Sequence, residues 1–346
     1  MPGETLKKAS SEKVGVLVIN LGTPDSTEVE DVRRYLRQFL SDPRVLDINP
    51  LLRWFLLNFI ILRRRPAESA HAYKSIWMEE GSPLLVYSHA LVEELRLRMP
   101  DRVIALGMRY GNPSIESALD ELARAQVDRV IVAPLYPQYA ASSTGTALEV
   151  VYEHVAKGWN VPSVQVLSPF YEHEGFIDAW ASVCRRAFDD FNPDHVLFSY
   201  HGLPERHVQK SDPTGQHCLQ EGCCDAIVDA NRHCYKAHCY ATTRALCASL
   251  GLEGDFSVAF QSRLLKDPWV QPFTDERLVE LAKSGSKRLA VVCPSFVADC
   301  LETLEEIGIR AKEDFQAAGG EDLRLVPSLN VEEVWVAHLT RMLEEL

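Results

Sequence analysis

The sequence has no hydrophobic run as long as the roughly 18–20 residues that a membrane-spanning helix requires. Its N-terminal stretch, MPGETLKKASSEK, is polar and lacks the apolar core of a signal peptide. Basic residues are in deficit: the formal net charge is −13, and a protein this acidic repels the phosphates of a nucleic acid. These absences predict a cytoplasmic protein that does not bind nucleic acid.

Phosphate-binding loops are missing as well. The chain contains neither a G-x-G-x-x-G nor a Walker A pattern, so nothing supports nucleotide binding. The nine cysteines do not indicate a disulfide framework, because cytoplasmic thiols stay reduced. Six of the nine lie between Cys218 and Cys247, and this clustering indicates a metal site.

Eight short β-rich runs are nearly continuous in apolar residues, which is typical of parallel strands covered on both faces. The first four are Val14–Leu21, Val103–Tyr110, Arg129–Leu135 and Val164–Phe170. The second four are His195–His201, Phe256–Arg263, Arg288–Phe296 and Leu323–Leu329. Helical patterns lie between them, at Ile115–Ala125, Phe176–Phe188, Asp275–Ala282 and Asp299–Ala311. This alternation predicts an α/β fold with helices on both faces of the sheets.

The order of elements repeats once, which predicts two α/β domains with four parallel strands each. We expect the first domain at residues 14–170 with an insertion at 49–66. The second spans 171–330 with a cysteine-rich insertion at 212–240, and a helix at 331–346 ends the chain. Ligands of parallel sheets bind beyond the carboxyl ends of the strands, so the active site should lie in a cleft between the domains.

A histidine follows the fifth predicted strand. His201 stands in the run Ser199–Pro204, SYHGLP. A neutral imidazole at a strand end can accept a proton or bind a metal near neutral pH. The alternative is a loop histidine that forms only local hydrogen bonds.

Four acidic residues fall on one side of the last predicted cleft helix: Asp299, Glu302, Glu306 and Glu313. A solvated acidic face is one interpretation. The other follows from position, since this helix begins just after a strand and should open Asp299 and Glu302 onto the cleft. Clustered carboxylates repel one another, which raises their proton affinity and suits proton relay or cation binding.

The first insertion is apolar and then basic. Leu51–Leu62 reads LLRWFLLNFIIL, and three arginines, Arg63–Arg65, follow. A buried core helix is one interpretation. The other is an apolar lip at the mouth of the cleft that touches a membrane surface, with its arginines on anionic head groups.

Six motifs, in order along the chain, resemble the ferrochelatase family. They are Asn20–Pro24 (NLGTP), Met108–Tyr110 (MRY), Leu135–Tyr139 (LYPQY) with Ser142–Gly145 (SSTG), Ser199–Pro204 (SYHGLP), Phe260–Arg263 (FQSR) with Trp269, and Asp299–Leu304 (DCLETL). The resemblance implies two Rossmann-like domains with a porphyrin in the cleft between them. It also implies insertion of ferrous iron into protoporphyrin IX to form protohaem, the terminal step of haem biosynthesis.

The resemblance implies roles for particular residues. His201 and Glu302 match residues that bind the metal or manage its protons, and Asp299 and Glu306 match a line of acidic residues leading away from the porphyrin. A base beside the ring would remove the two pyrrole protons as the metal enters.

Four further residues match the walls of the family's pocket. Arg109 and Tyr110 match the wall on the proposed side of metal access, and Phe296 and Trp269 match residues that pack on the macrocycle. For the last two, plain core packing is the alternative.

The spacing of the clustered cysteines fits zinc or an iron–sulfur cluster, since each accepts four thiolates. The resemblance favours a [2Fe–2S] cluster, because some ferrochelatases carry one. No cysteine follows Cys300, so the insertion must supply every ligand. We expect the ligands to be Cys218, Cys223, Cys234 and Cys239, with Cys224 as the substitute for Cys223.

Other functions stay open at this stage. One is a chelatase for another metal or for coproporphyrin. Another is a carrier of porphyrin or metal, with the cysteines as a redox sensor. The lip adds the expectation of peripheral contact with the inner face of the membrane.

Overall fold

The computed structural model describes residues 12–264 and 267–346, so most of the polar N-terminal stretch lies outside the described residues. The first sheet contains β1 (Val14–Thr23), β2 (Val103–Gly111), β3 (Arg129–Pro134) and β4 (Ser163–Val166) in the order β2-β1-β3-β4. The second contains β5 (His195–His201), β6 (Phe256–Gln261), β7 (Arg288–Val292) and β8 (Asp322–Leu325) in the order β6-β5-β7-β8. All pairs are parallel, and the predicted α/β fold with two four-stranded sheets is confirmed.

The strands form where the sequence has continuous apolar runs. In β1, the four residues Val16–Ile19 are completely buried, because helices cover both faces of the sheet. Three of the runs end four residues earlier than expected: β4 at Val166, β7 at Val292 and β8 at Leu325. Each of these runs continues into a proline, which has no N–H to donate to a neighbouring strand.

Helices and short π-helical stretches connect the strands. The first half contains α1 (Val29–Ser41), α2 (Pro50–Leu56), π-helix η1 (Leu57–Ile61), α3 (Leu62–Ile76), α4 (Pro83–Arg98), α5 (Ile115–Arg124), π-helix η2 (Ala141–Gly145) and α6 (Thr146–Val155). The second half contains α7 (Glu174–Phe191), α8 (Glu205–Lys210), 3₁₀-helix η3 (Asp229–Asn231), α9 (Tyr235–Leu250), α10 (Thr274–Lys283), α11 (Leu301–Leu304), π-helix η4 (Glu306–Ala311), α12 (Lys312–Ala317) and α13 (Glu333–Glu344).

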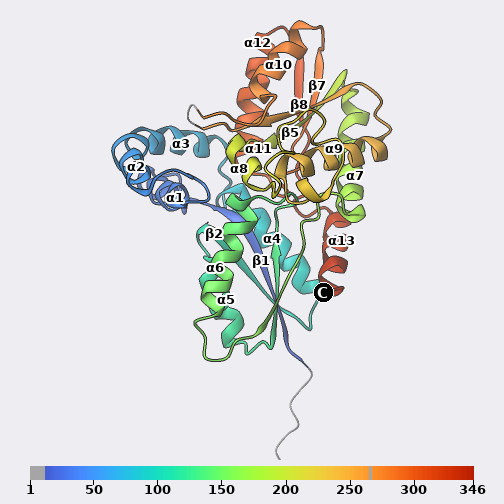
Figure 1. Ribbon diagram of the computed structural model, residues 1–346. Helices are drawn as coiled ribbons and strands as arrows, with labels where there is room; N and C mark the ends of the chain where they lie inside the picture. The colour runs from blue at the N-terminus through green and yellow to red at the C-terminus, as the bar shows by residue number, and fades with distance from the viewer. Residues whose placement is uncertain (1–11, 265–266) are drawn as a thin grey trace, which may run out of the picture.

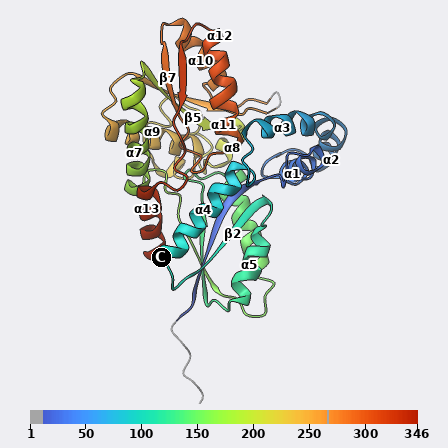
Figure 2. The same ribbon diagram turned by 180° about the vertical axis from the view of Figure 1, so that it is seen from behind.

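The two sheets lie one above the other, and α1–α3 project sideways near the level where the two halves meet (Figures 1 and 2). Helix α13 lies on the opposite side and packs on α7 and α4, so it joins both halves. One buried cluster contains Val18 of the first sheet, Val292 of the second and Trp335 of α13. The domain boundaries expected at 170/171 and 330/331 therefore remain a prediction. Across the described ranges, no helix has the length and apolar content needed to cross a membrane.

The helix expected at Asp299–Ala311 has a different form. It begins at Leu301, with Cys300 as its N-cap, and Glu306–Ala311 is π-helical. A π-helix carries more residues per turn than an α-helix, so the acidic residues do not share the single face that α-helical spacing predicts. Glu313 lies in the next element, α12.

Candidate active site

A cavity of about 610 Å³ lies between the two halves, within the usual size range of small-molecule sites. Residues at or just after strand ends of both sheets line it, including Thr23, Tyr136, His201, Ser262 and Phe296. The three π-helices of the described chain also contribute, through Ile61, Ser142 and Ser143, and Glu306 and Ile307. Irregular helical geometry is common at functional sites, and here it borders one cavity.

His201 is the last residue of β5 and lines this cavity. Its Nδ1 lies 2.7 Å from the carbonyl oxygen of Gly202. Because a carbonyl can only accept, Nδ1 must donate, and in the neutral ring the lone pair is on Nε2. Gly202 lets the chain turn here, since a Cβ would meet the carbonyl oxygen of Gln261 at 2.9 Å. The hydrogen bond from Nδ1 favours the tautomer in which Nε2 of His201 can accept a proton.

Glu302 and Glu306 line the same cavity from α11 and η4. The backbone N–H of Ser262 donates to Oε1 of Glu306 at 2.9 Å, and its hydroxyl donates to Oε2. Burial raises the pKa of Glu306, the nearby charge of Glu302 raises it further, and the hydrogen bond from Ser262 opposes them. The net rise favours the protonated form of Glu306, as expected for a half-buried carboxyl group beside another carboxylate.

Asp299 does not line the cavity. Its carboxylate accepts hydrogen bonds from Asn330 Nδ2 at 2.8 Å, Thr303 Oγ1 at 3.0 Å and the Ser328 amide at 3.3 Å. This placement differs from the expected opening onto the cleft, because the helix starts two residues later and Asp299 stands on the extended backbone before it. Asp299 holds the start of α11 against residues 328–330.

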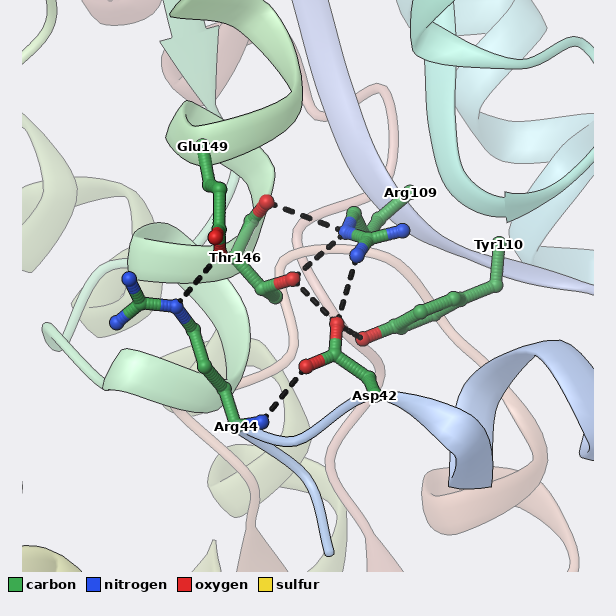
Figure 3. A network of polar contacts seen from close by, with 6 residues as sticks. All are labelled: Asp42, Arg44, Arg109, Tyr110, Thr146 and Glu149. Atoms are coloured by element: carbon green, nitrogen blue, oxygen red, sulfur yellow. Dashed lines mark hydrogen bonds and ion pairs between the residues drawn. The ribbon is translucent and has the colours of Figure 1, made fainter. Parts of the chain in front are cut away.

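Arg109 and Tyr110 also lie outside the cavity lining. Both point to Asp42 at the end of α1: Arg109 Nη2 lies 2.6 Å and the Tyr110 hydroxyl 2.8 Å from Asp42 Oδ2 (Figure 3). The Thr146 hydroxyl and the Arg44 amide donate to the same carboxylate. Burial raises the pKa of Asp42, but these hydrogen bonds and the Arg109 charge outweigh it, so the net pKa is lowered. The network ties the base of α1–α3 to the first sheet.

One contact connects the Asp42 network to the cavity, and another connects it to helix α6. The Tyr110 ring supports Phe39, a cavity-lining residue, edge-on at a centroid distance of 5.1 Å. Beside it, Arg44 Nε lies 2.8 Å from Glu149 Oε2 in α6 (Figure 3). Arg109 and Tyr110 therefore reach the cavity through Asp42 and Phe39.

Phe296 and Trp269 line the cavity. The Phe296 ring lies 6.3 Å from the His201 ring, centroid to centroid. Trp269 donates from Nε1 to the carbonyl oxygen of Leu264 at 2.8 Å, which fixes the plane of its indole. Two aromatic rings in the lining of one cavity suit a flat, apolar ligand.

Sequence reasoning missed a chain of hydrogen-bonded polar side chains in the cavity lining. Ser295 Oγ donates to Gln138 Oε1 at 3.0 Å and lies 2.9 Å from the Tyr235 hydroxyl. These three side chains come from the loop after β3, the loop after β7 and helix α9, and all line the cavity. Gln138 belongs to a quoted motif, but nothing in the sequence singled out Ser295 or Tyr235.

A family model for ferrochelatase matches residues 13–346. The chain belongs to the ferrochelatase family. It is a metal-chelating lyase, and its reaction is the insertion of iron into a porphyrin in haem synthesis.

Curated relatives are similar over nearly their whole length. The chain is 49% identical to a ferrochelatase of Coxiella burnetii (strain Dugway 5J108-111) over 335 residues, 96% of this chain and 94% of the relative. It is 48% identical to a ferrochelatase of Azotobacter vinelandii, with 94% and 97% covered. The solved structure of SirB from Bacillus subtilis with Fe³⁺ has a TM-score of 0.54 at 13% identity, covering 96% of this chain and 95% of SirB, and supports the fold.

The cysteine-rich insertion of this ferrochelatase-family chain brings four thiols into two contacting pairs. Cys223 Sγ lies 3.7 Å from Cys224 Sγ. A hydrogen bond with Cys218 lowers the pKa of Cys234 to about 6, and the amides at the start of α9 add to this. Cys239 is fully buried inside α9. In residues 12–264 and 267–346, no three His, Cys, Asp or Glu side chains already converge as metal ligands would.

The insertion is folded around two side chains that the sequence did not single out. The Asp212 carboxylate accepts from the amides of His217 and Cys218 at 2.8 and 2.9 Å. Asn231 Nδ2 donates to the carbonyl oxygens of Cys223 and Ala226, each at 2.8 Å. Both residues hold the loop in place without using a thiol.

The apolar insertion is exposed. Leu51, Trp54 and Phe55 keep 81%, 59% and 50% of their surface accessible, whereas Leu57 and Ile61 are buried beneath them. This exposure favours the lip interpretation over a buried core helix. The base of the lip also contacts the second half, because Lys210 Nζ in α8 lies 2.5 Å from Asp47 Oδ2.

Proposed function

We propose that this chain inserts ferrous iron into protoporphyrin IX to form protohaem, with His201 and Glu302 as the catalytic residues. The observation that carries the proposal is the cavity itself. The His201 imidazole with its Nε2 lone pair, the carboxyl groups of Glu302 and Glu306, and the rings of Phe296 and Trp269 line a single space between the halves.

The reaction releases two pyrrole protons, and the cavity offers groups to take them. In the proposal, Nε2 of His201 accepts a proton from the ring as the metal enters. Glu302 and Glu306 pass protons on, and the raised pKa of Glu306 suits it to hold one. The Ser262 hydrogen bonds fix the orientation of the Glu306 carboxyl during this transfer.

The cavity must also receive hydrated iron and a flat ring. Imidazole nitrogen and carboxylate oxygen can replace the water that Fe²⁺ sheds before insertion. Metal insertion needs a puckered ring with exposed nitrogen lone pairs. Phe296 and Trp269, whose indole is oriented by its hydrogen bond to Leu264, would favour the puckered over the flat ring, which is selective stabilisation of the transition state.

The remaining predicted residues have positioning roles in this proposal. Asp299 sets the start of α11 and so the place of Glu302. Arg109 and Tyr110 hold Asp42, and through it the wall of the cavity that includes Phe39. None of these three side chains lines the cavity, so we assign none of them to contact with iron.

The test is turnover with defined substrates. The purified protein is mixed anaerobically with Fe²⁺ and protoporphyrin IX, and loss of the porphyrin absorption bands is followed. Parallel reactions contain coproporphyrin, or Zn²⁺ or Co²⁺ in place of iron. Faster turnover of coproporphyrin would overturn the choice of substrate, and binding without turnover would support the carrier alternative.

We also propose that the insertion holds a [2Fe–2S] cluster. Four thiols at one end of α9 fit this group in number and chemistry, and the contacting pairs favour Cys218, Cys223, Cys224 and Cys234. Cys224 thus replaces Cys239 in the predicted ligand set. The cluster would stabilise the loop and takes no part in the insertion step, which involves no net redox change.

Iron, sulfide and zinc analysis of the purified protein, with its visible spectrum, tests the cluster. Cys224→Ser should lose colour and sulfide, and Cys239→Ser should keep both. Cys184→Ser, a buried cysteine of α7, is the control for general loss of folding. Stoichiometric zinc without sulfide would refute the cluster and support the zinc alternative.

We further propose that the chain is cytoplasmic and attaches peripherally to the inner face of a membrane through the lip. The exposed side chains of Leu51, Trp54 and Phe55 support this. Replacing Trp54, Phe55 and Phe59 by Ser should weaken sedimentation with anionic vesicles. The control variant replaces Leu97, Tyr152 and Trp159, which are exposed outside the lip. Equal binding by both variants would contradict the proposal.

A further inference from the structure

A second, smaller hollow lies on the lip itself. It is an open hollow of about 310 Å³ between α1 and the α2–η1 segment, and it shares no lining residue with the large cavity. Arg37 and Ser41 of α1 border it, together with Arg53, Trp54 and Asn58. The substrate site described above does not use this hollow.

The two arginines of the hollow are held in place but have free hydrogen-bonding capacity. Arg37 Nη1 donates to Asn58 Oδ1 at 2.7 Å, and Arg53 Nη1 donates to the carbonyl oxygen of Leu46 at 3.1 Å. Within residues 12–264 and 267–346, neither guanidinium forms an ion pair with a carboxylate. Each has five N–H donors, so several stay available for an anion.

The charge around the hollow is opposite to that of the protein. Residues 48–67 contain four arginines and no acidic residue, although the whole chain has a net charge of −13. An anion that most of the surface repels is therefore attracted to the lip. Arg53 belongs to this cationic segment and Arg37 comes from α1, and both line the hollow, whose described lining contains no acidic residue.

The apolar surroundings identify the anion. Trp54 borders the hollow and also packs edge-on against Phe59, within the exposed apolar surface that includes Leu51 and Phe55. Tryptophan concentrates at the boundary between lipid head groups and acyl chains. With these side chains inserted to a depth of about 5–10 Å, the arginines of the hollow would lie near the level of the phosphates.

We propose that Arg37 and Arg53 form a binding site for the phosphate of an anionic phospholipid head group. The proposal rests on the membrane attachment proposed above and adds a specific ligand to it. Two guanidinium groups, each oriented by one hydrogen bond, would grip the phosphate in the bidentate manner that arginine allows. This predicts a saturable site and not only diffuse attraction between charges.

The experiment compares two variants of equal charge by sedimentation with vesicles of phosphatidylglycerol and phosphatidylcholine. R37Q/R53Q removes the pair in the hollow. R63Q/R64Q removes two exposed lip arginines outside it. Diffuse charge alone predicts the same loss, about 30-fold, for both variants. The site predicts about tenfold greater loss for R37Q/R53Q. Equal losses would overturn the proposal.

Two further measurements make the outcome unambiguous. R37K/R53K keeps the charge but not the planar fork, so a specific site predicts that it binds more weakly than wild type, and full recovery contradicts the site. Inorganic phosphate, compared with chloride at equal ionic strength, should weaken vesicle binding of wild type more than that of R37Q/R53Q, because it competes for the same guanidinium groups. Saturable binding of inorganic phosphate to wild type without vesicles, together with equal vesicle binding by the two arginine-pair variants, would assign the hollow to free phosphate and overturn the lipid.

The membrane proposal can fail separately. If the Trp54, Phe55 and Phe59 triple variant binds vesicles like wild type, attachment through the lip is wrong, whatever the arginine variants do. If the triple variant loses binding while the two arginine pairs behave alike, the lip attaches but has no head-group site. Thermal unfolding of each variant checks that the fold is retained.

Discussion

Two carboxyl groups near the cavity show opposite behaviour. Asp42, at the end of α1, accepts from Arg109, Tyr110, Thr146 and the Arg44 amide, and its pKa is lowered. Glu306, in η4, has fewer donors and an acidic neighbour, and its pKa is raised. The charge of Asp42 is balanced by its hydrogen-bond donors and by Arg109, so Asp42 has a structural role. Glu306 has no such balance and can bind a proton.

The positive charge of Arg310 does not reverse this difference. Arg310 lies close to Glu306, but its Nε donates to the Glu305 carboxylate at 2.8 and 3.0 Å. The charge of Arg310 lowers the pKa of Glu306. This effect is smaller than the effects of burial, of the Ser262 hydrogen bond and of the Glu302 charge. A carboxyl kept protonatable beside an imidazole is the arrangement expected of proton transfer, whereas a paired one is expected of structure.

The two groups must also affect stability in opposite directions as pH changes. Asp42 has a lowered folded pKa, so its contribution is present above the unfolded value of about 3.9 and is lost as pH falls through the folded pKa. Glu306 has a raised folded pKa, so stability falls as pH rises from about 4.3 through that pKa.

The largest expected effect is the loss of turnover when the proposed proton acceptor, His201, is removed. His201→Ala should lower turnover by a factor on the order of 10²–10⁴, because it removes the proposed base. Folding should be retained, since the described hydrogen bond of the ring goes only to the adjacent Gly202. Anaerobic iron insertion and circular dichroism measure the two effects. His207→Ala, the other histidine of the cavity, is the control, and equal loss in both variants would remove the special role of His201.

The next effect separates turnover from binding. Glu302→Gln should lower kcat by roughly 10²-fold with little change in porphyrin affinity, since the proposed task is handling protons and metal. Single-turnover kinetics and fluorescence titration with porphyrin give the two quantities. Glu305→Gln removes a neighbouring carboxylate already bound by Arg310, and it should have a much smaller effect on kcat. A loss confined to affinity would make Glu302 a binding residue.

Substitution of Asp42, the structural member of the pair, should lower the free energy of unfolding. Asp42→Asn leaves the buried Arg109 charge without its partner and should destabilise the fold by about 3 kcal/mol. Urea unfolding at several pH values measures it. Below about pH 4 the difference from wild type should shrink, because protonation of Asp42 removes the same charge. An undiminished difference at low pH would show that the ion pair is not its cause.

The sequence predicted the strands, their parallel pairing and the place of His201, because each depends on local patterns. Continuous apolar runs require a sheet covered on both faces, and a residue at the end of such a run must lie at its carboxyl edge. The π-helix at Glu306–Ala311 was not predictable in this way. Its extra residue per turn moves Glu306 out of register with Glu302, and no local pattern marks the change.

The hydrogen-bond partners of Arg109, Tyr110 and Asp299 could not be predicted from the sequence, for a related reason. Asp42 is 67 residues from Arg109, and Asn330 is 31 residues from Asp299. A side chain at a strand or helix end can turn toward the cavity or toward a distant partner, and local patterns do not distinguish these. Family resemblance placed all three near the site, but only the contacts separate positioning residues from cavity residues.

The smallest expected effect tests how the Glu306 pKa is set. Ser262 donates two hydrogen bonds to Glu306 and lowers its pKa against the effect of burial. Ser262→Ala removes the hydroxyl bond and keeps the amide bond, so the pKa should rise further. A single hydrogen bond contributes about 0.5–1.5 kcal/mol, so this is the smallest of the expected effects.

The dependence of kcat on pH measures this rise. If a Glu306 that ionises is needed for proton release, the limb of the profile where kcat increases with pH should move to higher pH in Ser262→Ala. Ser295→Ala removes a cavity hydroxyl that bonds to Gln138 instead, and it should leave that limb in place. Glu306→Gln should abolish the limb, because the titrating group is gone. A limb that persists in Glu306→Gln, or moves downward in Ser262→Ala, would assign the titration to another group and leave Glu306 a structural residue like Asp42.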